Sequence, residues 1–207
     1  MNLYVGIDPS INSTGLCVLV YDDNDFVKEY FYIVKPNKLS KKEDSAELKY
    51  IDKFEYLIYG KLTSEDNHKE EIYKATNMMN IVSNIEDAIS KVDHKFGAYN
   101  KIYICIEGIS YGSSTRTKSI FDLAGLNYLI REMVIRKSLS NPDKIRFVIG
   151  TPGEIKKFAT GNGNANKDVI INCFKQIYPD FALPKLDDVA DAYFMANYAK
   201  SISGSLE

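Results

Sequence analysis

Two strand-length apolar runs in this chain each end on a carboxylate. The first covers residues 3–7 (LYVGI) and ends on Asp8; the second covers residues 101–106 (KIYICI) and ends on Glu107. An acidic side chain at the end of a buried strand costs free energy unless it is paired or holds a metal ion. If the two strands are parallel neighbours, both acids lie where open α/β sheets bind ligands. We therefore expect Asp8 and Glu107 to anchor an active site.

The apolar pattern predicts an α/β fold with one mixed sheet flanked by helices. A turn rich in Pro, Ser, Asn and Gly joins the first two apolar runs, and a third run rich in aromatic and β-branched residues follows at 26–34. This pattern predicts an antiparallel meander. After it, runs with helical spacing alternate with short apolar runs of strand length, as in βαβ units. Strands are expected at 3–8, 13–21, 26–34, 101–106 and 144–149, and helices at 68–92, from Ser119 to about Arg136, after Thr151-Pro152, at 167–177 and at 186–199.

The length of 207 residues, 45% of them apolar, favours a single domain, which we place at residues 1–203. Residues 37–71 form a charged insertion after the third strand, with a cluster of apolar side chains between Leu48 and Tyr59. This insertion either packs a small apolar cluster on the main body or forms an arm that faces the substrate or a second subunit. The ending 204–207 (GSLE) is interpreted as a vector scar.

Several protein classes do not fit the composition. No run approaches the roughly 18 apolar residues of a membrane span, and the first residues lack the pattern of a secretory signal. The three cysteines lie in apolar settings and are expected as free thiols, so we predict a cytoplasmic protein without a membrane partner. Their spacing and the two histidines fit no zinc site. A net charge of −2 means that any nucleic acid must be held by local basic patches.

A second pair of acids opens the last predicted helix. Asp188 and Asp191 are three residues apart and share a helix face; Asp187 and Asp191, four apart, share one equally well. Four carboxylates at close quarters cannot all be ionised without cations, and oxygen ligands select Mg²⁺ or Mn²⁺. Two such ions about 3.5–4 Å apart support phosphodiester hydrolysis. The competing interpretation is that each acid only caps a turn or a helix.

Four motifs in order resemble a known family. GIDPSINSTG, IEGISYGSSTRTKSIFDLAGL, TPGEIKKFATGNGNANKDVI and KLDDVADAYFMA are similar to segments of the RuvC-type Holliday-junction resolvases of the ribonuclease H-like superfamily. The resemblance covers residues 1–34 and 101–200. It implies a ribonuclease H-like fold with a five-stranded mixed sheet. It also implies a homodimer that cuts four-way DNA junctions with divalent metal ions.

The resemblance also implies roles for single residues. Asp8 matches the first catalytic aspartate, Glu107 the strand-end glutamate, and Asp188 and Asp191 the DxxD pair, together holding two Mg²⁺ ions for which Mn²⁺ substitutes. Lys167 matches a basic catalytic residue that neutralises phosphate or developing charge, and Asp187 takes an outer position. The long insertion, the acidic net charge and Tyr111 depart from the bacterial pattern. They indicate a divergent member that is either phage-encoded, and then works in the host cytoplasm, or specialised in another way.

Basic and aromatic residues near these motifs are candidates for DNA contacts. Tyr111 is placed to stack on an opened base, or else is an ordinary packed or solvated tyrosine. Phosphate contacts from lysine and arginine give affinity and salt dependence without reading sequence. The alternative for each cation except Lys167 is an ordinary solvated side chain. The candidates are Arg116, Lys118, Lys156, Lys157, Lys167 and Lys175.

Three functions compete at this stage. The first is a metal-dependent endonuclease that resolves Holliday junctions or other branched DNA. The second is a nucleotide-handling protein of the actin or sugar-kinase type, because Asp8 and Thr14-Gly15 resemble the phosphate hairpin of that class. A chain of this length lacks the second lobe which such proteins close on a nucleotide. The third is a non-catalytic binder of branched DNA, which is expected to have lost the acids that this chain retains.

Overall fold

The computed structural model describes residues 1–97, 101–109 and 117–206; the side chains of residues 117–119 lie outside the description. Each strand and helix predicted outside residues 37–71 is present, with ends that differ by a few residues. The elements are β1 (Asn2–Asp8), β2 (Thr14–Asp22), β3 (Asp25–Pro36), α1 (Lys41–Lys49), β4 (Phe54–Tyr59), α2 (Asn67–Lys95), β5 (Lys101–Glu107), α3 (Thr117–Ser140), β6 (Ile145–Gly150), α4 (Pro152–Thr160), α5 (Lys167–Ile177), α6 (Leu186–Ile202) and the 3-10 helix η1 (Ser203–Ser205).

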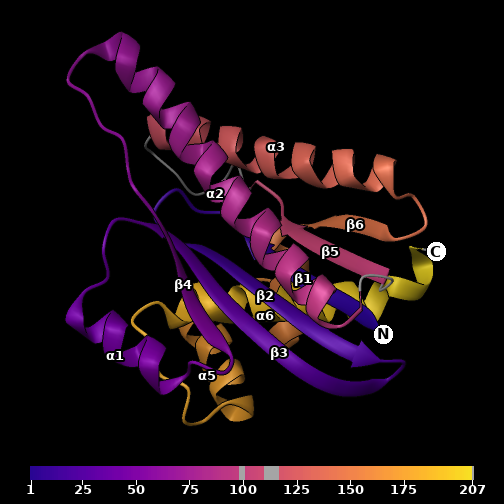
Figure 1. The fold of residues 1–207 in the computed structure, drawn as a ribbon. Helices are drawn as coiled ribbons and strands as arrows, with labels where there is room; N and C mark the ends of the chain where they lie inside the picture. Colours follow the sequence, from indigo (N-terminus) through magenta and orange to yellow (C-terminus); the bar gives the residue numbers. More distant parts are fainter. Residues whose placement is uncertain (98–100, 110–116, 207) are drawn as a thin grey trace.

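One mixed sheet runs through the molecule in the order β4-β3-β2-β1-β5-β6 (Figure 1). The β1–β2 and β2–β3 pairs are antiparallel, as the meander predicts, while β1–β5, β5–β6 and β3–β4 are parallel. The predicted count of five strands is wrong, because β4 adds a sixth at the edge. This strand comes from the insertion. Phe54 and Tyr56 are buried against one face of the sheet and Tyr59 is buried against the other, because successive side chains of a strand point to opposite faces.

Residues 37–71 are therefore part of the sheet and of the helix that follows it. They form α1, β4 and the start of α2. Lys35 on β3 forms an ion pair with the buried Glu43 of α1. A Glu47 carboxylate oxygen accepts a hydrogen bond from the Tyr56 backbone nitrogen on β4 (2.7 Å). Tyr50 donates its hydroxyl proton to the Asp180 carbonyl in the loop before α6. These contacts fix the segment to the main body.

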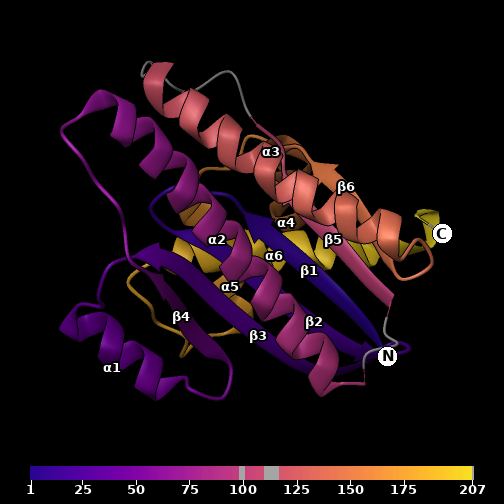
Figure 2. The same cartoon turned by 45° about the horizontal axis from the view of Figure 1, so that its top comes forward.

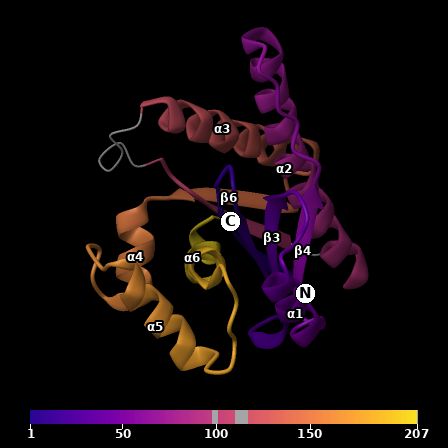
Figure 3. The same ribbon diagram turned by 90° about the vertical axis from the view of Figure 1, so that its left-hand side faces the viewer.

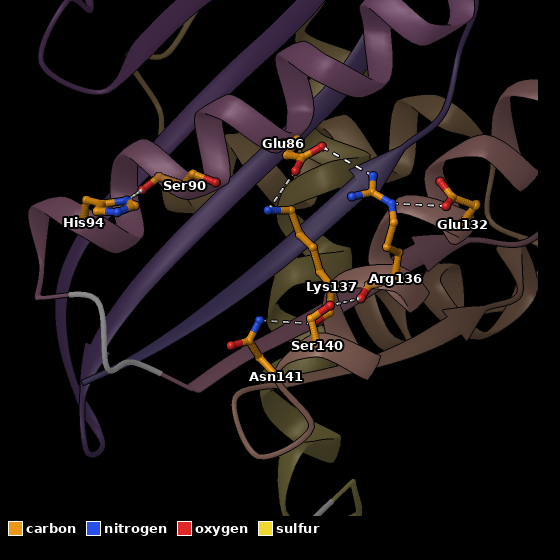
Figure 4. A network of polar contacts seen from close by, with 8 residues as sticks. All are labelled: Glu86, Ser90, His94, Glu132, Arg136, Lys137, Ser140 and Asn141. Carbon is orange, nitrogen blue, oxygen red and sulfur yellow. Dashed lines mark hydrogen bonds and ion pairs between the residues drawn. The ribbon is translucent and has the colours of Figure 1, made fainter.

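Helices cover both faces of the sheet. Figure 3 shows α2 and α3 on one side and α4, α5 and α6 on the other, and Figure 2 shows α2 and α3 side by side. The strand side chains divide between two apolar clusters accordingly, one under α2 and α3 and the other under α4–α6. Ion pairs from Glu86 on α2 to Arg136 (3.9 Å) and Lys137 (2.9 Å) on α3 join α2 to α3 (Figure 4).

The helix α6 lies directly on the centre of the sheet because two glycines leave room for it. A Cβ atom at Gly6 would lie 1.9 Å from the Ala192 carbonyl oxygen, and one at Gly15 would lie 2.1 Å from the Asp188 carbonyl oxygen. Real Cβ atoms do not approach backbone so closely, so glycine at both positions sets the height of α6 above β1 and β2. The consequence for function is that the first turns of α6 reach the end of β1.

The C-terminus is folded against the opposite end of β6. The helix η1 continues α6, and the Leu206 carbonyl accepts a hydrogen bond from Arg146 Nε (3.2 Å). The residues interpreted above as a vector scar therefore take part in the fold as far as Leu206. No helix in the described part of the chain is both long and apolar enough to cross a membrane.

Candidate active site

Asp8 and Glu107 lie side by side at one edge of the sheet. They are the last residues of the parallel neighbours β1 and β5, whose register pairs Ile7 with Ile106. Their carboxyl groups share a hydrogen bond. Burial, and then the charges of Glu107, Asp191 and Asp188, hold the pKa of Asp8 well above its usual range. Burial also raises the pKa of Glu107, while the hydrogen bond from Asp8 and the charges of Lys156 and Lys167 oppose that rise.

The helix α6 brings its own acids to this edge. Asp188 and Asp191 lie in its first two turns, above β1 and β2. Burial and the charge of Glu107 raise the pKa of Asp191 to about 7. Burial raises the pKa of Asp188, although a hydrogen bond from Ser13 lowers it in part. The four predicted acids therefore act on one another electrostatically, as a shared site requires.

The turn between β1 and β2 positions one of these acids. Thr14 closes the turn, donating from Oγ1 to the Ser10 carbonyl (2.6 Å) and accepting from the Ser10 nitrogen (3.1 Å). The turn places the hydroxyl of Ser13, which is buried, as a donor to the Asp188 carboxylate. Nothing in the sequence marks Ser13 for this role except its place in a polar turn after Asp8.

Lys167 faces the acids from the first residue of α5. A cation is unfavourable at a helix N-terminus because the helix dipole is positive there. The ion pair between Lys167 Nζ and an Asp187 carboxylate oxygen offsets this cost. Burial opposes the shift, but this pair raises the pKa of Lys167 and lowers that of Asp187. The structure therefore gives Asp187 a partner outside the group of four acids.

A cavity of about 410 Å³ opens at this edge. Its lining residues come from the ends of β1 and β5, from α3, and from the starts of α4, α5 and α6. They are Pro9, Glu107, Gly108, Ile109, Leu123, Asn127, Pro152, Lys156, Lys167, Ile170 and Asp191. Two of the predicted acids and two of the predicted cations thus line one cavity.

The donor set fits a hard divalent cation in its chemistry. All four acids offer oxygen, which Mg²⁺ and Mn²⁺ prefer, and burial raises the pKa of each of them. Within residues 1–97, 101–109 and 117–206, no three acidic, histidine or cysteine side chains surround a common point closely enough to be ligands as they stand. Carboxylates without a cation repel one another and share protons instead. The site has the donors, and their side chains need to converge to hold an ion.

The predicted DNA contacts divide into three groups. Lys156 lines the cavity, and Lys157 is exposed beside it on α4. Lys175 is exposed on α5. Lys118 lies in the first turn of α3 with its side chain outside the description, and Tyr111 and Arg116 lie outside the described residues.

Comparisons with known proteins bear on the fold. No protein-family model and no curated protein sequence matches the chain. Among solved structures, Thermus thermophilus RuvC aligns with a TM-score of 0.52 at 14% identity, over 99% of this chain and 98% of that one. T. thermophilus RuvC in complex with Holliday junction substrate aligns at 0.49 and 14%, over 100% and 99%. The yeast mitochondrial Holliday junction resolvase Ydc2 aligns at 0.44 and 13%, over 96% and 83%. The first alignment shows that the chain has the RuvC-type fold, as the four motifs predicted.

Proposed function

We propose that this protein is a metal-dependent endonuclease that resolves Holliday junctions or related branched DNA. The observation that carries the proposal is that two parallel strands and one helix bring four acids to the same edge of the sheet, where Glu107 and Asp191 line a cavity together with two lysines. The RuvC-type fold supports this reading, and the branched substrate rests on the resemblance of the four motifs to resolvases.

Each residue has a defined part in the proposed reaction. Asp8, Glu107, Asp188 and Asp191 would hold two Mg²⁺ or Mn²⁺ ions, which supply an activated water and stabilise the leaving 3′-oxygen when bound. Ser13 holds the Asp188 carboxylate in one orientation. Lys167 donates to the scissile phosphate and balances the charge that develops there. Lys156 draws the phosphate backbone into the cavity.

We also propose that the active form is a homodimer joined through α3. Four large apolar side chains lie on the outer face of this helix at spacings of seven and four residues. They are exposed by 72% (Phe121), 60% (Tyr128), 42% (Ile135) and 78% (Leu139). An apolar row of this length is more typical of an interface than of a solvated helix. A two-fold pair of sites is what paired incisions across a junction require.

The test uses a labelled synthetic four-way junction and a linear duplex of matched sequence. Each is incubated with the protein in Mg²⁺, in Mn²⁺ or in EDTA. We expect symmetric nicks in the junction with either metal and none in EDTA. The variant Asp8→Asn should bind the junction and leave it uncut. Cutting by Asp8→Asn would exclude the proposed site, and tight junction binding without cutting in any metal would favour a non-catalytic binder.

A further inference from the structure

A second cavity, of about 250 Å³, lies beside the 410 Å³ cavity of the candidate active site. In the turn after Asp8, Pro9 lines the first cavity and Ile11 lines the second. On α3 the two cavities likewise divide adjacent residues, since Leu123 lines the first and Asp122 the second. The two cavities are therefore neighbours, separated by the β1–β2 turn and the start of α3.

The outer wall of the second cavity is the segment between β4 and α2. Because β4 runs parallel to β1, its end at Tyr59 lies at the same edge of the sheet as Asp8. The Tyr59 hydroxyl donates to the Ile11 carbonyl (3.4 Å), which ties this segment to the β1–β2 turn. The buried Asn77 of α2 holds Leu62 by two hydrogen bonds of 2.9 Å, one to its backbone nitrogen and one to its carbonyl. Part of the insertion thus forms a fixed wall beside the candidate active site.

Apolar and hydrogen-bonding side chains share the lining of the second cavity. Its apolar side chains are those of Ile11, Leu62, Met78 and Ile81. Two hydroxyls and two carboxylates supply polar groups, from Thr63, Ser64, Glu70 and Asp122. A nucleobase has apolar faces and an edge of donors and acceptors, so it suits such a lining. A phosphate group does not, because the two carboxylates repel it.

Lys61, which also lines this cavity, is suited to a phosphate of the DNA backbone. Its side chain is exposed and forms no ion pair with any residue in the described part of the chain. Lys74, the other cation of the lining, is already paired with Glu70 (3.3 Å) and Glu71. A DNA strand with a phosphate in the first cavity would cross the β1–β2 turn, place its next base in the second cavity and meet Lys61 beyond it.

We propose that the second cavity binds the base of a nucleotide next to the scissile phosphate, and that residues 61–64 contribute to the choice of cleavage sequence. Taking a base out of a duplex costs free energy, and this cost is smallest where the base is already unpaired. The subsite therefore favours branched DNA with an unpaired base at the branch. This inference rests on the proposed function, because it needs DNA in the first cavity, and it requires no metal ion.

Disulfide crosslinking tests where each base lies. Thr63→Cys places a thiol at the second cavity, and each junction carries an exchangeable disulfide tether on one base near the cut. The Asp8→Asn background keeps the DNA intact and, without an added cysteine, measures the reaction of the partly exposed Cys173. Lys157→Cys, exposed beside the first cavity, reports whether DNA lies there. Asp143→Cys, exposed before β6 at the opposite edge of the sheet, is the negative control.

We expect Thr63→Cys to crosslink to one base next to the cut, on the order of tenfold more than to bases further away. Asp143→Cys should not exceed the background. A second variant tests recognition: Thr63→Phe, which fills the cavity, should reduce the discrimination between bases at that position by on the order of tenfold. Glu65→Phe is the matched control, because Glu65 is exposed in the same segment and lies outside the lining, so the discrimination should be unchanged.

The two cysteine positions distinguish failure of this inference from failure of the proposed function. Crosslinking through Lys157→Cys but not through Thr63→Cys would overturn the base subsite and leave the proposed function standing. Equal crosslinking of Thr63→Cys to every base, or unchanged discrimination in Thr63→Phe, would also overturn the subsite. If neither cysteine crosslinks and the protein does not bind the junction, the proposed function fails together with this inference.

Discussion

The carboxylate of Asp8 lies near three other acidic side chains, those of Glu107, Asp188 and Asp191. Its pKa in the folded protein lies well above the usual range, first because of burial and then because of these neighbours. The unfolded chain releases the same proton near pH 3.9. Asp8 therefore favours the folded state only while it is protonated, and the stability that it contributes is lost as pH rises through its folded pKa.

Replacing Asp8 should reverse this loss. We expect Asp8→Asn to be more stable than the parent protein at pH 8, by an amount on the order of 1–3 kcal/mol. The two should be equally stable near pH 2.5, where Asp8 is protonated in both states. The measurement is urea unfolding in EDTA at pH 2.5, 6 and 8.

Asp187 gives the opposite sign and serves as the control. Its pKa is lowered by the ion pair with Lys167, so its contribution is present above its unfolded pKa and is lost as pH falls through the folded value. Asp187→Asn should therefore be less stable than the parent at pH 8. Equal pH profiles for the two variants would contradict the electrostatic account of the site.

The four acids can be predicted from the sequence because each has a recognisable position in an apolar or helical pattern. Asp8 and Glu107 end apolar runs, and Asp188 and Asp191 are three apart at the start of a helix. Periodicity assigns residues to faces but does not name hydrogen-bond partners. The pairing of Lys167 with Asp187 and of Ser13 with Asp188 was therefore out of reach.

At the level of elements, the site depends on how closely α6 approaches the sheet. Gly15 on β2 faces the backbone of Asp188, so any side chain there must push the first turn of α6 away from Asp8. The contact between Gly15 and the Asp188 backbone thus affects both the position of the α6 acids and the stability of the fold.

We expect Gly15→Ala to destabilise the protein by about 3 kcal/mol or more, because a Cβ atom meets rigid backbone. Gly60→Ala is the matched control, since a Cβ atom at Gly60 meets nothing within 4 Å. It should change the stability by no more than about 0.5 kcal/mol. Urea unfolding of both variants measures the difference, and a Gly15→Ala protein as stable as Gly60→Ala would show that α6 can move freely.

The sixth strand, β4, could not be predicted from the sequence alone. Residues 54–59 (FEYLIY) are strand-like, but the run is short and lies in a segment dense in Lys, Glu and Asp. Its pairing with β3 is parallel and requires α1 to cross between them. Such a non-local pairing depends on contacts that no local pattern contains, so the sequence predicts an insertion outside a five-stranded sheet where the structure has a sixth strand.

For the molecule as a whole, the proposed dimer makes a prediction independent of the acids. A charge in the middle of the exposed row on α3 should separate the subunits. We expect Ile135→Glu to sediment as a monomer at concentrations where the parent protein is a dimer, with unchanged Mn²⁺ affinity. Its unfolding midpoint should not depend on protein concentration, whereas that of the parent should. Leu48→Glu, at a side chain 72% exposed on α1, should remain a dimer. A parent protein that is monomeric at all concentrations, or a dimeric Ile135→Glu, would contradict the α3 interface.

The hydrogen bond from the Tyr56 nitrogen to Glu47 has a consequence for how copies of this molecule meet in a crowded solution. The outer edge of β4 would otherwise offer a free backbone donor to any extended chain. The Glu47 side chain of α1 accepts the hydrogen bond from this donor, so the Tyr56 nitrogen cannot pair with an added strand in an amyloid-like aggregate. Self-association is thereby directed away from the sheet edge, which is a safeguard against aggregation built from the same segment that widens the sheet.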